Sequence, residues 1–347
     1  MKIGKFKIGL KKPPFIVAEL SGNHDGSLKK ALSIVDEVAK AGAHAIKLQT
    51  YTPDSMTLNL KKTGFIIKDP KSPWKGKSLY NLYKKAMTPW KWHKPIFDRA
   101  KKRGLEYFSS PFDEKAVDFL ESLKVPAYKI ASFENIDTNL IKKVSSKKKP
   151  VIISTGMATL REIKEAYNTA RYSGCNEIAL LKCTSTYPCS PLESNLKTIS
   201  DLRKKFKCEI GLSDHTMGIG AALTSISFGA SIIEKHITLK RSEGGVDSSF
   251  SLEPQELSQL VRESKSAYKS LGSVYYGPTK SEKKNIKFRR SIYVVKNVNV
   301  EDRVNTNNIR SIRPGLGLAP KLFNNVIGKK FKKKIKKGTP LTWKLIR

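Results

Sequence analysis

The chain has 347 residues, of which 39% are hydrophobic, so it can bury one large core and a small second domain. No apolar run approaches the roughly 18 residues of a membrane span, and residues 1–7 lack the apolar stretch of an export signal. These features exclude a membrane protein and predict a cytoplasmic one whose four cysteines are reduced thiols.

The formal net charge is +36, which raises nucleic acid as a candidate partner because clustered Lys and Arg neutralise phosphates. Most of this charge is lysine, spread over nearly every amphipathic segment, as is typical of solvated helix faces. The densest run, residues 329–337, lies near the C-terminus. We therefore expect no nucleic-acid partner, and the charge is better suited to attracting a small anionic substrate.

Short apolar runs rich in β-formers alternate with segments of helical periodicity from residue 15 to about residue 271. The runs are Phe15–Leu20, Ala43–Gln49, Leu105–Ser109, Ala127–Ser132, Pro150–Ser154, Glu177–Cys183, Cys208–Ser213 and Ser231–Ile237. Eight repeats in about 260 residues predict an α/β fold of the (β/α)8 TIM-barrel type rather than a doubly wound sheet. The barrel is expected over residues 1–271.

Two regions depart from this repeat. Residues 51–89 contain Pro53, Pro70, Pro73 and Pro89 and two aromatic clusters, so we expect a lid or rim loop rather than plain barrel. After residue 271 the helical period disappears, which predicts a linker over residues 272–290. The remaining residues, 291–347, form short β-like pieces, which predict a small β-rich domain packed on the barrel or on a partner's barrel.

The carboxyl ends of barrel strands carry function in this fold, and polar residues gather there. They are Glu19, Lys47, Gln49, Ser109, Ser110, Lys129, Ser132, Glu134, Ser154, Thr155, Ser185, Tyr187, Ser213, Asp214, His215, Glu234 and His236. Because side chains alternate along a strand, Lys47 and Gln49 share one face, as do Glu234 and His236.

Two lysines at these strand ends point to an anion. An inward-facing Lys47 or Lys129 costs desolvation unless an anion meets it, so together they predict a phosphate or carboxylate ligand. The alternative is that each lysine pairs with a barrel carboxylate such as Glu19 or Glu134. Serine hydroxyls would complete an anion cradle, although a strand-end serine often bonds only a turn. These serines are Ser110, Ser132, Ser185 and Ser213.

Two of the five histidines, His215 and His236, stand where consecutive predicted strands end. Taken singly, His215 or His236 is as well explained as a hydrogen-bonded core histidine, but as a pair they favour a metal site. Two imidazoles with water suit Mn²⁺ or a similar divalent ion better than a closed zinc site. His93, by contrast, is expected on a helix surface.

Six segments resemble a known family. They are Phe15–Ser27, Ala45–Asp54, Tyr128–Ser132, Cys183–Pro188, Gly211–Thr216 and Glu234–His236. In this order they resemble the nonulosonic acid synthases, the sialic acid synthase family, and the C-terminal piece resembles that family's antifreeze-like (SAF) domain. Residues 47–57 and 244–254 look most like the pseudaminic acid branch, with the sialic and legionaminic acid branches next. Ser185 stands where sialic acid synthases commonly carry Asn, which favours the sister branch.

The resemblance implies a metal-dependent transferase that condenses phosphoenolpyruvate with the open-chain aldehyde of 2,4-diacetamido-2,4,6-trideoxy-altrose, giving pseudaminic acid and phosphate. It implies catalytic roles for Glu134, His215, His236 and Lys129, with Mn²⁺ on the two histidines and Mg²⁺ or Co²⁺ as alternatives. Phosphoenolpyruvate would be bound by Lys47, Ser110, Lys129, Ser132, Ser185 and Ser213. The sugar would be bound by Glu19, Gln49, Tyr187, Asp247, Phe288 and Arg313. In relatives an arginine like Arg313 crosses to the other subunit, so a homodimer is expected.

Three alternatives stay open. The protein could carry out the same reaction on N-acetylmannosamine or on a legionaminic acid precursor, because discrimination among these sugars depends on only a few contacts. A metal-dependent aldolase using pyruvate would keep the barrel and release no phosphate. A polyanion-binding protein would show steeply salt-dependent affinity for nucleic acid, but it leaves the strand-end residues unexplained.

Overall fold

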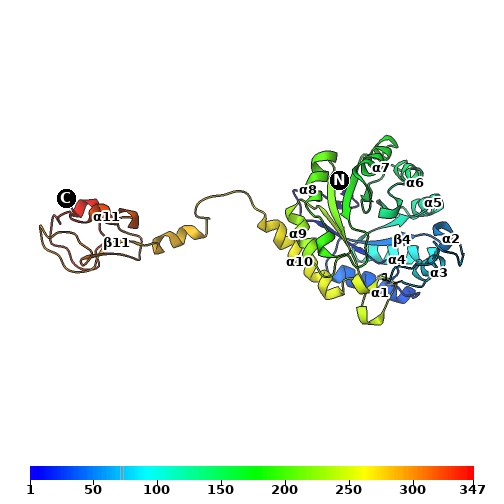
Figure 1. The fold of residues 1–347 in the computed structure, drawn as a ribbon, viewed down its shortest axis with the longest axis horizontal. Helices are drawn as coiled ribbons and strands as arrows, with labels where there is room; N and C mark the ends of the chain where they lie inside the picture. Colours follow the sequence, from blue (N-terminus) through cyan, green and yellow to red (C-terminus); the bar gives the residue numbers. More distant parts are fainter. Residues whose placement is uncertain (71, 73) are drawn as a thin grey trace. The chain divides into compact units, whose positions relative to one another are not determined.

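The computed structural model describes residues 1–70, 72 and 74–347, which form two compact units, Met1–Gly272 and Ser273–Arg347. Within these described residues, the first unit contains a closed barrel of eight parallel strands (Figure 1). The strands are β3 (Phe15–Glu19), β4 (Ala45–Thr50), β5 (Glu106–Pro111), β6 (Tyr128–Ile130), β7 (Val151–Ser154), β8 (Ile178–Cys183), β9 (Glu209–Asp214) and β10 (Ile232–His236). They follow chain order around the barrel, and β10 closes it against β3. The predicted TIM barrel is confirmed, and each apolar run of the sequence contributes one strand.

Helices surround the strands (Figure 1). They are α1 (Leu28–Lys40), α2 (Pro53–Met56), α3 (Leu79–Ala86), α4 (Trp90–Lys102), α5 (Glu114–Ser122), α6 (Thr138–Ser145), α7 (Leu160–Tyr172), α8 (Thr198–Phe206), α9 (Gly220–Ser227) and α10 (Pro254–Ser270). In α1 the buried residues Ala31, Ile34, Val35 and Val38 recur at helical spacing, so one face packs on the strands. Asp113 starts α5 by accepting a hydrogen bond from the Ala116 amide at 2.6 Å. None of the helices in the described part of the chain is long and apolar enough to cross a membrane.

A small hairpin fills the amino-terminal end of the barrel. Its strands β1 (Lys2–Ile3) and β2 (Phe6–Lys7) pair antiparallel, and Ile3 and Ile8 join one apolar cluster with barrel residues such as Phe108. The backbone amides of Lys2 and Lys5 are held by carboxylates near the starts of two strands, at 2.8 and 2.9 Å. This end of the barrel is therefore packed with side chains.

Residues 51–89, apart from residues 71 and 73, which lie outside the described residues, form the short helices α2 and α3 joined by irregular chain. An isolated bridge between Ile66 and Ser78 folds the connection back on itself. Several of its side chains line the large cavity described below. The segment therefore contributes to the rim of the barrel mouth.

The second unit has its own apolar core. Strands β11 (Ser291–Val294) and β12 (Ile309–Ile312) pair antiparallel, and the short helix α11 (Phe323–Val326) follows. Buried side chains of this core include Ile292, Val304, Phe331 and Leu341. Isolated bridges add further β contacts, so the predicted small β-rich domain is present.

Candidate active site

The strand register brings predicted site residues to one level of the barrel. Glu19 at the end of β3 lies beside Lys47 on β4 and beside His236 on β10. On the next strands, Gln49 pairs with Ser110 and Glu234 pairs with Ser213. Charged and polar groups from separate strands thus meet at the carboxyl ends, as the sequence predicts.

A cavity of about 920 Å³ opens at this end of the barrel. Of the predicted site residues, Gln49, Ser132, Glu134, Ser185, Tyr187, His236 and Asp247 line it. Glu19, Lys47, Ser110, Lys129, Ser213 and His215 are buried in the same end of the barrel. A cavity of this size has room for two small substrates in contact.

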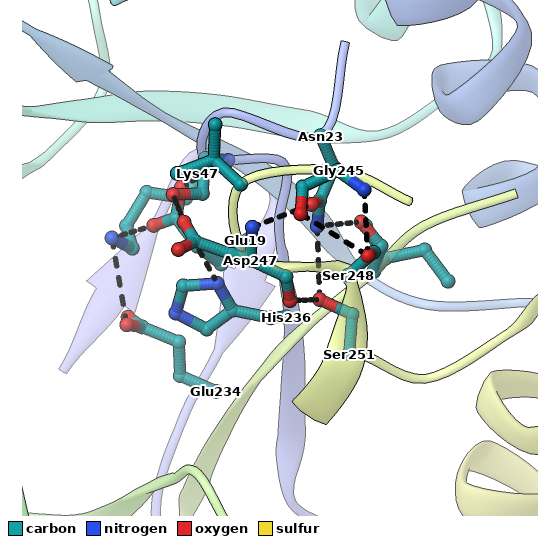
Figure 2. A network of polar contacts seen from close by, with 12 residues as sticks. Glu19, Asn23, Lys47, Glu234, His236, Gly245, Asp247, Ser248 and Ser251 are labelled. Atoms are coloured by element: carbon teal, nitrogen blue, oxygen red, sulfur yellow. Dashed lines mark hydrogen bonds and ion pairs between the residues drawn. The ribbon is translucent and has the colours of Figure 1, made fainter. Parts of the chain in front are cut away.

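Lys47 lies between two carboxylates (Figure 2). Its ammonium group, with the residue 3% exposed, forms ion pairs with Glu19 and, at 3.4 Å, with Glu234. Burial lowers the pKa of Lys47 to about 8, although the Glu234 charge opposes this effect. The sequence left open whether Lys47 meets an anionic ligand or pairs with a barrel carboxylate. The structure shows the pairing with a carboxylate.

Lys129 has different neighbours. It is 2% exposed, and its ammonium group donates to Ser154 Oγ at 2.6 Å and to the Ile130 carbonyl at 3.1 Å. Among the residues that the structure describes, no carboxylate forms an ion pair with it, so the alternative pairing with Glu134 is not observed. A buried ammonium held only by neutral groups is suited to an anionic ligand.

Glu134 ends the 3-10 turn Ser132–Glu134 and lines the cavity. Burial raises the pKa of its carboxyl group to about 7, and the positive charge of Lys129 opposes part of this rise. Its Oε2 atom is buried without a hydrogen-bond partner in the described part of the chain. Such a carboxyl group can gain and lose a proton near neutral pH.

The four predicted serines differ in their contacts. Ser110 Oγ lies 3.4 Å from the Lys47 ammonium, and Ser213 Oγ donates to Glu234 at 3.4 Å. Ser132 Oγ accepts a hydrogen bond from the Gly156 amide at 3.2 Å. Ser185 lies on the cavity wall, 3.8 Å from Cys183 Sγ. Their long or weak contacts leave these hydroxyls available to a ligand.

His215 and His236 lie side by side, with ring centroids 5.3 Å apart. His215 Nδ1 lies 3.0 Å from the Thr184 carbonyl, which fixes that ring nitrogen as a donor. Burial lowers the pKa of His236 well below its usual value, and the neighbouring positive charges add to the effect. His236 is therefore neutral at neutral pH, the form in which imidazole binds metal ions.

Of the predicted sugar-binding residues of the barrel, Gln49, Tyr187 and Asp247 line the cavity, and Glu19 does not. Asp247 is 8% exposed, accepts a hydrogen bond from Ser21 and lies 4.0 Å from His236 Nδ1. The Tyr187 ring lies 4.5 Å from the His215 ring and 5.7 Å from the Trp74 ring, between centroids. Hydroxyl, carboxylate and aromatic groups together can contact a sugar.

Phe288 and Arg313 belong to the second unit. Phe288 ends the 3-10 helix Glu282–Phe288 and is 52% exposed, and Arg313 follows β12 and is exposed. Their sugar-binding role, which includes contact with another subunit, stays a prediction.

Comparisons with known proteins agree with this geometry. The NeuB family model matches residues 34–276, and the SAF domain model matches residues 289–347. The chain belongs to the NeuB family. It is 43% identical over 341 residues to a pseudaminic acid synthase of Campylobacter jejuni, covering 98% of each chain. It is 41% identical to the pseudaminic acid synthase of Helicobacter pylori, over 95% of this chain and 97% of that one.

Two solved structures share the fold. The Bacillus subtilis spore coat polysaccharide biosynthesis protein SpsE is 32% identical, with a TM-score of 0.67 over 100% of this chain and 99% of that chain. The sialic acid synthetase of Leptospira borgpetersenii is 34% identical, with a TM-score of 0.73 over 82% of this chain and 94% of that chain.

His215 and His236 are the two imidazoles that could hold a divalent ion in this NeuB chain. His236 Nδ1 is buried without a hydrogen-bond partner among the described residues, and the Asp247 carboxylate lies 4.0 Å from it. In the same described residues, no group of three or more His, Cys, Asp and Glu side chains is arranged to hold a metal. Water or substrate oxygens would therefore complete the coordination of an ion on His215 and His236, an arrangement that suits Mn²⁺ better than structural zinc.

Sequence reasoning assigned no role to several residues of this NeuB site. Glu234 was recognised only as a strand-end residue, yet it contacts Lys47 and Ser213. Trp74 lines the cavity and donates from Nε1 to the Val246 carbonyl at 2.8 Å. The aromatic clusters of residues 51–89 were the available signal for Trp74, whereas only the fold could reveal the Glu234 contacts.

The expectation that His93 lies on a helix surface was wrong. It is 0% exposed, and its Nε2 atom lies 2.8 Å from Thr50 Oγ1. The same face of α4 buries Ile96 and Phe97, three and four residues later, so His93 belongs to the packed side of the helix.

Proposed function

We propose that this protein is a pseudaminic acid synthase, which condenses phosphoenolpyruvate with 2,4-diacetamido-2,4,6-trideoxy-β-L-altropyranose and water to give pseudaminic acid and phosphate. The observation that carries the proposal is the gradient of identity among NeuB relatives. Three pseudaminic acid synthases are 41–43% identical over nearly their whole length, whereas two N,N'-diacetyllegionaminic acid synthases are 34% identical.

The buried lysines account for binding of phosphoenolpyruvate. Its phosphate and carboxylate are anionic, and Lys129 offers an ammonium group that no described carboxylate pairs with. Lys47 adds charge beside Ser110, and Ser132, Ser185 and Ser213 donate hydrogen bonds. The substrate anions would give these groups charge-assisted partners, which are strong in a desolvated site.

The second substrate would react as an open-chain aldehyde. The enol carbon of phosphoenolpyruvate attacks the aldehyde carbon, and a new carbon–carbon bond forms as the aldehyde oxygen gains charge. When bound at His215 and His236, a divalent ion, Mn²⁺ by our proposal, supplies Lewis acidity for that oxygen. Gln49, Tyr187 and Asp247 would bind the sugar's hydroxyl and acetamido groups from the cavity wall, with Glu19 next to them.

Glu134 would manage the proton of the attacking water. After carbon–carbon bond formation, water adds to the electron-poor carbon that carries the phosphate. Glu134 accepts one proton from this water and passes it to the former aldehyde oxygen, which becomes a hydroxyl group. The tetrahedral carbon then forms its C=O bond as the carbon–oxygen bond to phosphate breaks, and the second proton of the water leaves with the phosphate. A pKa of about 7 lets the same carboxyl group accept and return a proton at neutral pH. The Arg313 side chain of a second subunit, by our proposal, completes the sugar site in a homodimer.

The decisive experiment is mass spectrometry of products from the purified full chain, phosphoenolpyruvate and Mn²⁺ with a panel of sugars. We expect pseudaminic acid from the diacetamido altrose sugar, together with one phosphate for each product. Preference for N-acetylmannosamine or the legionaminic acid precursor would overturn the substrate assignment. Product formation from pyruvate without phosphate release would instead favour an aldolase.

The metal proposal has its own test. Chelation should stop turnover, added Mn²⁺ should restore it, and His215→Ala or His236→Ala should not respond to Mn²⁺. Metal content of the purified chain and of both variants, measured by elemental analysis, gives a readout besides activity. Full activity after chelation, with unchanged metal content in both variants, would remove the metal from the proposal.

A further inference from the structure

Asp247 lies on an irregular segment, residues 237–253, that follows the last barrel strand and has little regular structure to hold it. Buried side chains supply its partners (Figure 2). Asn23 is 0% exposed, and its Oδ1 atom accepts a hydrogen bond from the Asp247 amide at 3.3 Å. Its Nδ2 group donates to the Ile237 carbonyl at 2.8 Å and to Ser251 Oγ at 2.9 Å. Three contacts from one buried amide link both ends of the segment.

Ser251 completes the arrangement. It is 1% exposed and donates from Oγ to the Asp247 carbonyl at 2.6 Å, while accepting from Asn23. The amide and the carbonyl of Asp247 are therefore both bonded by side chains, which is how buried irregular backbone avoids unpaired polar groups. Ser21 donates directly to the Asp247 carboxylate. The carboxylate thus has a fixed direction at the cavity wall.

We infer that Asn23, acting with Ser251, is a positioning residue that holds Asp247 in place for the sugar substrate. Asn23 follows β3, and Asp247 follows β10, so the link joins the loops after the first and last barrel strands. The inference rests on the proposed function, since it assumes that Asp247 binds a polyhydroxylated acetamido aldehyde. It assigns neither Asn23 nor Ser251 a contact with substrate.

The test compares Asn23→Ala and Ser251→Ala with Ser231→Ala in the full chain. Ser231 is the control because it is a 2% exposed serine next to the opposite end of β10, where its hydroxyl is within reach of the Glu209 carboxylate at 2.8 Å and the Ile210 carbonyl at 3.0 Å. We expect Asn23→Ala to raise KM for the diacetamido sugar at least tenfold, because misplacing a binding group by about 1 Å can cost on the order of a hundredfold. Ser251→Ala should have a smaller effect in the same direction. KM for phosphoenolpyruvate should stay unchanged in both, and Ser231→Ala should change neither KM.

A purely structural role gives a different pattern. If Asn23→Ala raised both KM values equally, or if Ser231→Ala matched its effect on the sugar, positioning would be wrong. Hydrogen exchange provides a readout that needs no turnover: the Asp247 amide should exchange faster in Asn23→Ala and at the normal rate in Ser231→Ala. If no sugar in the panel is converted by the unaltered chain, the proposed function fails. Hydrogen exchange then decides the positioning alone, and an unchanged rate at Asp247 overturns it. Should Asn23→Ala not fold, Ser251→Ala carries the same comparison.

Discussion

The two buried lysines of the barrel mouth have similar sequence settings and different surroundings. Lys47 on β4 is neutralised by Glu19 and Glu234, which come from the strands on one side of the barrel. Lys129 on β6 meets Ser154 and a backbone carbonyl, and no carboxylate of the described residues pairs with it. Lys47 is therefore held by ion pairs within the protein, whereas the hydrogen-bond partners of Lys129 are neutral, although its charge also acts on Glu234 and Glu134.

This difference teaches that burial alone does not identify a binding residue. A buried ion pair contributes little net stability but is costly to break, because the remaining charge stays in a low-dielectric setting. A buried ammonium whose hydrogen-bond partners are neutral can receive an anion without first separating an ion pair in direct contact. The two residues should therefore respond to the same substitution in different measurements.

The largest effect is expected on stability at Lys47. Lys47→Ala leaves Glu19 and Glu234 buried without their cation, so the free energy of unfolding should fall by about 3–5 kcal/mol. Denaturant unfolding measures the change. The isosteric variant Lys47→Met should lose stability for the same reason. Adding Glu19→Gln to Lys47→Met should recover part of the lost free energy of unfolding, because one of the two unpaired buried charges is removed. A loss no larger than that of Lys129→Ala would break the comparison.

The next effect is expected on catalysis at Lys129. Lys129→Ala removes the ammonium group that no described carboxylate neutralises, so kcat/KM for phosphoenolpyruvate should fall by about 10²–10³-fold. Steady-state kinetics at saturating sugar measure this ratio. Lys94→Ala is the control, because Lys94 pairs with Asp98 on an exposed face of α4 and should change nothing. An equal loss in Lys47→Met at normal folding would show that both charges serve the ligand equally.

A smaller effect is expected on the pH dependence. Glu134 must be ionised to accept a proton, and its pKa is about 7, so kcat/KM should rise as pH increases through 7. The Lys129 charge lowers this pKa, so the rise should move to higher pH in Lys129→Met. In Glu134→Gln the residual activity should not rise over this range. A rise that persists in Glu134→Gln would assign the titration to another group.

Local sequence patterns were sufficient to predict the barrel, because each strand and its following helix are encoded in one short stretch. The polar strand ends were likewise predictable, since alternation fixes which residues share a face. The sequence could not distinguish Lys47 from Lys129, because their partners depend on strand register: Glu19 lies directly beside Lys47. It could not reveal the Asn23 link either, which joins residues more than 200 positions apart.

His93 illustrates a different limit. The run Trp90–Lys94 alternates aromatic and charged residues, so sequence alone does not reveal which side of the helix faces the barrel. The Thr50 hydroxyl, on a strand more than 40 residues away, forms a hydrogen bond with the imidazole, so His93 lies on the side of the helix that faces the barrel. Tertiary partners thus determine the environment of polar residues more than they determine strands and helices.

The hairpin at the amino-terminal end of the barrel determines the side from which substrates can enter and products can leave. Since Ile3 and Ile8 pack into that end, exchange with solvent is directed to the opposite face, where the cavity opens. Two reactants entering and two products leaving would share this opening, so the reactant that binds deeper has to enter before the other one. Phosphoenolpyruvate, bound at the lysines, would be that first arrival, and product inhibition patterns would record the sequence of events.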